Sequence, residues 1–333
     1  MDLLRLASLV LDRPHHITPE AASLVLGVLA DRTGIEEIVS ERRAYPVSSS
    51  FAGRRVVDKE TGAPKGYRIT EKGVAIIPVH GELVNRGAWV GASSGLVSYE
   101  GLRHSLKNAA ADKAVRSIVL DVDSPGGMAT GMLETGALVA AVASEKPVIA
   151  VGDGLMASAA YGLSAGASRV VAADSGAIGS IGTVWMHADR SRQIDRAGIK
   201  VTLIHAGARK VDGNSFTPLP DHVREERQVL LNRMQDDFIA HVARGRHLPE
   251  KDVRGTEAGI YLGRDAVSLG LADSVGTASD AVAEAETMSP RRTVVSVPSN
   301  RPAPPPQPAI PAAARSGTTK GKQMDNDIHS EPG

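Results

Sequence analysis

The sequence lacks cysteine and has few aromatic residues. The absence of cysteine excludes a disulfide framework, a thiol nucleophile, cysteine-ligated zinc and iron–sulfur clusters. Aromatic side chains make up 3% of the 333 residues, whereas glycine occurs 34 times. Hydrophobic residues still account for 42% of the chain, which is enough for a globular core. We expect this core to consist mainly of Val, Ile, Leu and Ala.

An excess of charge and a long apolar run are also missing. The 38 basic and 38 acidic residues cancel, so the composition gives no sign of a nucleic-acid partner. The apolar stretch over 136–143 ends at Ser144 and Glu145, whereas a membrane span needs about 20 apolar residues. Asp2 and Arg5 give the first residues the pattern of an amphipathic helix rather than of an export signal. We therefore expect no membrane span and a cytoplasmic protein.

The common metal and nucleotide motifs are absent from the sequence. It contains no HExxH, GxxxxGKS/T or GxSxG pattern, and Gly176, Gly179 and Gly182 follow the spacing GxxGxxG rather than GxGxxG. No histidine pair has helical metal-ligand spacing with an acidic partner. We therefore expect neither a metal nor a cofactor.

Composition and periodicity divide the chain into three parts. Residues 1–70 hold two predicted helices, the first over 1–16, and a loop or linker over 48–66. Residues 71–288 carry strong hydrophobic periodicity and form the main predicted domain. Residues 289–333 contain six prolines in a run of eleven residues and no aromatic residue, so we expect an extended or disordered tail.

Short apolar runs alternate with helical patterns throughout the main domain. Nearly continuous apolar strands that alternate with helices are typical of a parallel sheet covered on both faces. The pattern therefore predicts an α/β fold. The predicted strands cover 73–79, 117–122, 148–153, 169–174, 182–186 and 201–206, and the predicted helices cover 98–113, 128–145, 158–167 and Pro220 to Ala243.

Two segments at the ends of predicted strands could carry chemistry. In the first, Gly126 and Gly127 follow the strand over 117–122 and precede a helix that we expect to begin near Met128. Main-chain N–H groups at such a turn are not shielded by a Cβ and lie at the positive end of a helix, where they can bind a developing oxyanion. The alternative is a tight turn that needs glycine for its backbone conformation.

The second segment centres on Ser158, which lies among small residues between the strand over 148–153 and a helix. Open α/β sheets bind ligands at this edge, although a serine here also fits a helix N-cap. Lys210 follows the predicted strand over 201–206, so it could meet Ser158 at the same edge. It could act as a base only if desolvation lowered its pKa by about 3 units. The alternative is a solvated cation beside Arg209.

Four motifs together resemble the S49 peptidase family, which includes signal peptide peptidase A and phage capsid-assembly proteases. They are LDVDSPGG (120–127), ASAAY (157–161), GAIGSIGT (176–183) and AGARK (206–210), and the resemblance covers about residues 73–280. It implies a ClpP/crotonase-like α/β fold with repeated β-β-α units and a largely parallel sheet flanked by helices. It also implies a homo-oligomer and an S49 peptidase domain over 71–288.

The resemblance assigns roles to particular residues. The serine of the ASAAY box is the family's nucleophile, which falls on Ser158, and the downstream lysine is its general base, which falls on Lys210. The oxyanion donors fall on Gly126 or Gly127 together with Ala159. The run from Arg209 to Asp212 replaces the commoner GKYKD-like pattern, so the neighbours of this lysine differ from those usual in the family.

The absence of a membrane anchor and the short helical N-terminal region resemble the phage or prophage branch of the family. That branch implies a Ser/Lys endopeptidase that matures phage heads by cleaving scaffold, capsid or portal proteins in the assembling procapsid. The alternatives are a soluble signal-peptide-peptidase-A-like protease of host quality control, a crotonase-type acyl-CoA enzyme, and an inactive assembly protein with the same fold. The proline-rich tail would be a tether or an unstructured end.

Overall fold

The computed structural model describes residues 14–18, 54–87 and 96–290. The chain divides into one compact unit, Met1–Thr293, and a second, Val294–Gly333, which lies entirely outside the described residues. The helices predicted within the first thirty residues also lie outside them, apart from residues 14–18. The proline-rich tail lies outside them as well, apart from its first two residues.

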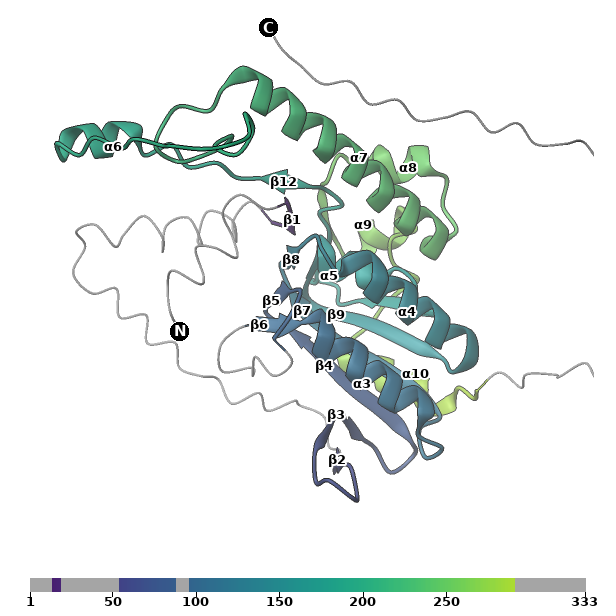
Figure 1. Ribbon diagram of the computed structural model, residues 1–333. Helices are drawn as coiled ribbons and strands as arrows, with labels where there is room; N and C mark the ends of the chain where they lie inside the picture. Colours follow the sequence, from purple (N-terminus) through teal and green to yellow (C-terminus); the bar gives the residue numbers. More distant parts are fainter. Residues whose placement is uncertain (1–13, 19–53, 88–95, 291–333) are drawn as a thin grey trace, which may run out of the picture. The chain divides into compact units, whose positions relative to one another are not determined.

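The main sheet is built around parallel strands (Figure 1). Strands β4, β7 and β9 lie side by side, and β10 and β11 both run parallel to β9. Their central residues are almost continuously apolar because helices cover both faces of the sheet. The strands are β2 (Arg54–Val57), β3 (Pro64–Ile69), β4 (Val74–His80), β7 (Ser117–Ser124), β9 (Val148–Ala157), β10 (Arg169–Ala172), β11 (Ala177–Gly179), β13 (Ile260–Leu262) and β14 (Ser274–Val275).

Helices flank this sheet and form two apolar layers with it. The larger layer joins the sheet to α3 (Tyr99–Ala111), α4 (Met132–Glu145), α5 (Ala159–Ser164) and the second half of α7 (Asp221–Arg246). The smaller layer joins the opposite face to α10 (Ala278–Thr287). The predicted α/β class, with a largely parallel sheet between helices, is confirmed. None of the described helices combines the length and the apolar character that a bilayer-crossing segment needs. The remaining helices are α6 (Ser191–Arg196), α8 (Glu250–Arg254) and α9 (Gly263–Ser268).

A second, smaller sheet crosses the ends of the first, in the order β12-β1-β8-β5-β6. It contributes β8 to the strand–strand–helix unit β7–β8–α4, which has the predicted β-β-α order, and both β5 and β6 to the longer unit β4–β5–β6–α3. Strand β1 lies between β8 and β12 and runs antiparallel to both. The strands are β1 (Pro14–Ile17), β5 (Glu82–Val84), β6 (Leu96–Ser98), β8 (Gly126–Met128) and β12 (Val184–Trp185).

The N-terminal region differs from the sequence-based expectation. Residues 14–17, expected in a helical region, form strand β1. The stretch expected to be a linker contains the hairpin β2–β3, which adds antiparallel strands to the edge of β4. Asp58 explains the hairpin turn, because its carboxylate accepts hydrogen bonds from the main-chain N–H groups of Glu60 and Thr61.

Two further predictions of secondary structure are wrong. The helix expected from Met128 begins at Met132, because Gly126 to Met128 pair as strand β8 with β1 and β5. Residues 201–206 form no strand and are exposed, and none of the strands in the described ranges pairs with them. An apolar run therefore predicts burial but does not supply the partner that burial needs.

Candidate active site

Ser158 lies at the sharp turn between β9 and α5. Its backbone has φ 55° and ψ −120°, a region that is strained for any residue with a side chain. Two hydrogen bonds hold the turn: the N–H of Ser158 donates to the carbonyl of Gly179 at 2.7 Å, and its carbonyl accepts from the N–H of Gly162 at 2.8 Å. The side chain makes no capping hydrogen bond to α5, so the N-cap alternative does not explain this serine.

The hydroxyl of Ser158 is buried without a hydrogen-bond partner. The residue is 0% exposed, and its Oγ contacts no donor or acceptor among the described residues. A buried polar group without a partner costs about 1–3 kcal/mol of stability, so such groups are rare in structural positions. Backbone strain and an unpaired hydroxyl thus coincide at one residue, which is typical of a functional site.

The Gly126 segment meets the Ser158 turn, as the sequence predicts. A side chain at Gly126 would lie 2.9 Å from Cβ of Ser158 and 3.0 Å from the main-chain nitrogen of Ala159. Ala159 is the first residue of α5, so its N–H has no partner within the helix. The N–H of Gly126 donates to Oγ of Ser124 at 3.2 Å, while Gly127 packs against the main chain of Leu83.

Lys210 is not brought to Ser158 within the chain. It is exposed in a series of turns between β12 and α7, and its N–H donates to the carbonyl of Gly207. The preceding Arg209 is paired with Glu226 of α7. Glu226 precedes Phe238 by twelve residues, or about 18 Å along the axis of α7. Phe238 lies in the part of α7 that packs on α5. The structure thus joins the serine and the glycines and leaves the lysine apart.

Strand β1 covers the serine turn, which sequence reasoning missed. A side chain at Gly126 would collide with the main-chain oxygen of His16, and the N–H of Thr18 donates to the carbonyl of Pro125 at 3.1 Å. One signal of extended backbone was present, because Thr18 precedes Pro19, and the residue before a proline avoids helical conformation.

The side chain of His16 is enclosed beside this turn. Its Nδ1 lies 2.9 Å from the carbonyl oxygen of Gly182 and 3.1 Å from Oγ1 of Thr183, and its ring centroid lies 4.4 Å from that of Phe238. Burial lowers the pKa of His16 to about 4; the hydrogen bond to Gly182 opposes this, and the charge of His15 adds to it. The ring is therefore neutral near pH 7.

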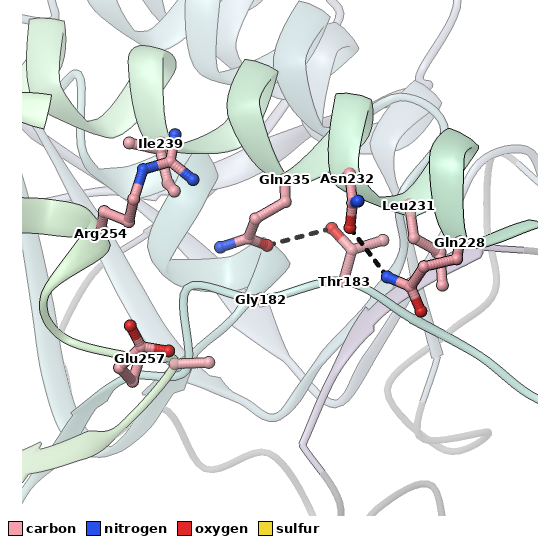
Figure 2. A pocket seen from close by; sticks show the side chains of 10 residues that line it. Gly182, Thr183, Gln228, Leu231, Asn232, Gln235, Ile239, Arg254 and Glu257 are labelled. Atoms are coloured by element: carbon pink, nitrogen blue, oxygen red, sulfur yellow. Dashed lines mark hydrogen bonds between the residues drawn. The ribbon is translucent and has the colours of Figure 1, made fainter. Parts of the chain in front are cut away.

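A polar recess of about 390 Å³ continues from this point (Figure 2). Gln235 on α7 faces Thr183 across it, with Oε1 3.4 Å from the threonine hydroxyl, and its Nε2 donates to the carbonyl of Ile181. Glu257 and Arg254 line the opposite part. Because Thr183 also contacts His16, the recess adjoins the strand that covers Ser158.

Acidic residues also lie at the carboxyl ends of the central strands, the same edge that carries Ser158: Asp123 is paired with His80 in register, and the N–H of Leu155 donates to Oδ1 of Asp123. Nε2 of His80 lies 2.9 Å from Oδ2 of Asp121. Burial alone would lower the pKa of His80, but the hydrogen bond and charge of Asp121, with the charge of Asp123, raise it above its usual value. No group of three or more histidine, aspartate or glutamate side chains within the described ranges is arranged to hold a metal ion.

Comparisons with known proteins find several that are similar to this chain. The model of peptidase family S49 matches residues 140–290, which include Ser158 and Lys210. The chain is 31% identical to capsid assembly protease C of Escherichia phage lambda, over 84% of this chain and 65% of that protein. It is 38% identical to head-tail preconnector protein GP5 of Enterobacteria phage P21, over 65% of this chain and 43% of that protein.

Two further proteins extend the comparison. Protease 4 of Salmonella typhi is 32% identical over 55% of this chain and 30% of its own length. A ClpP1 mutant from Listeria monocytogenes superposes with a TM-score of 0.41 at 12% identity, over 62% of this chain and 94% of that one. The chain thus spans less than two thirds of the length of both phage relatives. By the family match and these relatives, the chain is similar to members of peptidase family S49.

Proposed function

We propose that this protein is a serine endopeptidase with Ser158 as its nucleophile. The observation that carries the proposal is the buried, unpaired hydroxyl of Ser158 on a strained strand-to-helix turn. The match to the model of a peptidase family over residues 140–290 supports the same reaction. It also argues against the acyl-CoA alternative, which has no need of this serine.

In the proposed mechanism, Oγ of Ser158 attacks the carbonyl carbon of an extended peptide. The N–H of Ala159, at the start of α5, and an N–H of Gly126 or Gly127 receive the oxyanion. One such donor typically contributes about 10²–10³ to kcat. The base accepts the serine proton and passes it to the leaving amine, and water then hydrolyses the acyl-enzyme. No cofactor or metal enters these steps.

We assign the base to Lys210 of a neighbouring copy in a homo-oligomer. The segment between β12 and α7 that carries Lys210 also exposes large apolar side chains, including Ile204 at 96%, Ile199 and Phe216. Such a surface favours contact with another protein surface. Burial between copies would desolvate Lys210 and lower its pKa, which a serine-activating lysine needs.

For substrate, we propose proteins of an assembling phage head, such as scaffold, capsid or portal proteins, in the host cytoplasm. Two relatives are named for capsid assembly and for head-tail preconnection, which supports this choice. The second candidate is a signal-peptide-peptidase-like role in host protein turnover, supported by the likeness to protease 4. Cleavage of purified procapsid proteins, compared with cleavage of unfolded host proteins, separates the two.

A fluorophosphonate probe tests the nucleophile directly. The wild-type protein is expected to form one covalent adduct at Ser158, and Ser158→Ala is expected to form none. Ser164→Ala is the matched control, because Ser164 is also buried in α5 but donates its hydroxyl hydrogen to the carbonyl of Ala160 at 2.8 Å. Equal labelling of Ser158→Ala and wild type would refute the assignment.

A further inference from the structure

Strand β1 fills a gap between two strands that have no other partner on that side. Its His16 is paired with Gly127 of β8, and its His15 is paired with Val184 of β12, both in antiparallel register. Without β1, the facing edges of β8 and β12 would be open, and β12 pairs with no other strand in the described residues. Open strand edges bind extended polypeptides through main-chain hydrogen bonds.

The same strand lies over the nucleophile. A side chain placed at Gly126 would meet the main-chain oxygen of His16, Cβ of Ser158 and the main-chain nitrogen of Ala159. The oxygen of His16 therefore lies close to the serine turn. The N–H of Thr18 continues the pairing at Pro125. A carbonyl of β1 is thus placed beside the serine and the first N–H of α5, where a cleavable peptide would place its own.

The side chains that follow Pro14, which is itself half-buried, are as enclosed as the backbone of β1. His15, His16, Ile17 and Thr18 are all buried, with no more than 5% of any residue exposed. The ring of His16 occupies a space bounded by Gly182, Thr183 and Phe238. Residues 14–18 thus combine strand pairing on both sides with a side chain held in a recess, as a bound peptide would.

We propose that residues 14–18 are an internal, substrate-like strand that occupies the peptide channel and must leave it before another polypeptide can be cleaved. The competing occupant is an extended segment of a substrate protein that pairs with β8 and β12 in the same antiparallel direction. The inference rests on the proposed peptidase function, because it takes the groove beside Ser158 to be the substrate channel.

A reversible lock tests this occupancy. The chain has no cysteine, so His15→Cys with Val184→Cys places a single thiol pair on directly opposed residues of β1 and β12. Opposed residues of antiparallel strands have Cα atoms about 4.5–5.5 Å apart, within the range a disulfide spans. Hydrolysis of a short peptide is expected to be lost in the oxidised protein and to return on reduction. Equal turnover in both states would overturn the proposal.

Binding to an inactive variant separates this proposal from the proposed function. A fluorescent peptide with the sequence of residues 11–21 is titrated into Ser158→Ala, alone and with Ile17→Asp, which places a charge at a buried position of β1. A strand that leaves the channel open in a tenth of molecules weakens apparent affinity about tenfold. We therefore expect at least tenfold tighter binding with Ile17→Asp, and none of a scrambled peptide.

The two experiments together distinguish failure of this proposal from failure of the proposed peptidase function. One outcome is tight, sequence-dependent binding after Ile17→Asp without any hydrolysis by the wild-type protein. It would support residues 14–18 as a substrate-like strand and refute the proposed peptidase function. Hydrolysis by the wild-type protein with no gain in binding after Ile17→Asp would uphold the peptidase and show that β1 is a permanent part of the fold. If Ile17→Asp does not fold, the oxidised and reduced forms of the cysteine pair, each carrying Ser158→Ala, are titrated with the same peptide.

Discussion

The two residues assigned to the catalytic dyad lie in contrasting parts of the molecule. Ser158 is fully buried at the end of a central strand, and two main-chain hydrogen bonds hold its turn. Lys210 is exposed in a segment of turns, where neighbouring apolar side chains such as Ile204 and Phe216 are exposed as well. A single chain thus positions the proposed nucleophile, Ser158, by itself. The proposed base, Lys210, needs contact with another protein surface to become buried.

The largest effect on activity is expected from substitution of the buried residue, Ser158. Ser158→Ala should lower kcat for peptide hydrolysis by about 10⁴–10⁶, because the covalent route is lost while the oxyanion donors stay in place. The melting temperature should not fall, because the removed hydroxyl has no hydrogen-bond partner to lose. Steady-state kinetics and thermal unfolding of the purified variant check both statements. Residual activity within tenfold of the wild type would disprove the role of Ser158.

The role of Lys210 is tested by a substitution that keeps its positive charge but cannot accept a proton. Lys210→Arg should lose at least about 10² in kcat, because the pKa of arginine lies above about 12 and its side chain cannot accept the serine proton. Lys200→Arg is the control, since Lys200 is exposed in the same segment. A Lys210→Arg variant as active as Lys200→Arg would leave Lys210 an ordinary surface cation.

Mixing two inactive chains tests whether the serine and the lysine come from different copies. Ser158→Ala supplies an intact lysine and Lys210→Ala an intact serine. A head-to-tail contact between unlike chains therefore rebuilds about one site in four after random exchange. Peptide turnover should return on mixing, although neither variant has it alone. No recovery after verified subunit exchange would place both residues in one chain.

A pair of glycine substitutions compares the packing of the two regions. Gly126 and Gly198 both have positive φ, at 100° and 68°, but a side chain at Gly126 meets His16, Ser158 and Ala159, whereas one at Gly198 meets nothing within 4 Å. Gly198→Ala should cost only the strain of its backbone, about 1 kcal/mol of unfolding free energy. Gly126→Ala should cost more and abolish hydrolysis. Equal unfolding free energies would show that the serine turn is not tightly packed.

The last prediction concerns the pH dependence of stability. Because the folded pKa of His16 is about 4 and the unfolded value is 6.5, the unfolded chain binds more protons between these values. The contribution of His16 is therefore complete above pH 6.5 and is lost as the pH falls toward 4, by up to about 3 kcal/mol. Denaturant unfolding of His16→Gln should show a shallower loss than the wild type over this window. His205→Gln, at an exposed position near Lys210, should follow the wild type.

The same contrast explains what the sequence could predict. The apolar runs that became β4, β7 and β9 are flanked by helices of matching pattern, so local periodicity identifies both partners of each contact. Ser158 and Gly126 could be placed together because both follow strands of one parallel sheet. Residues 201–206 have an equally apolar pattern, but none of the described strands pairs with them, and periodicity cannot reveal that. Residues 14–17 are paired with strands more than a hundred residues away, which no local pattern encodes.

The pairing of β1 also fixes an order of events during synthesis. His16 leaves the ribosome 166 residues before Gly182, its hydrogen-bond partner. At about 5–20 residues per second, that interval lasts roughly 8–33 s. For most of it, until Gly126 to Met128 of β8 have been translated, the segment that becomes β1 has no strand to pair with. The nascent chain therefore already carries the strand that covers its nucleophile before the nucleophile itself has been translated.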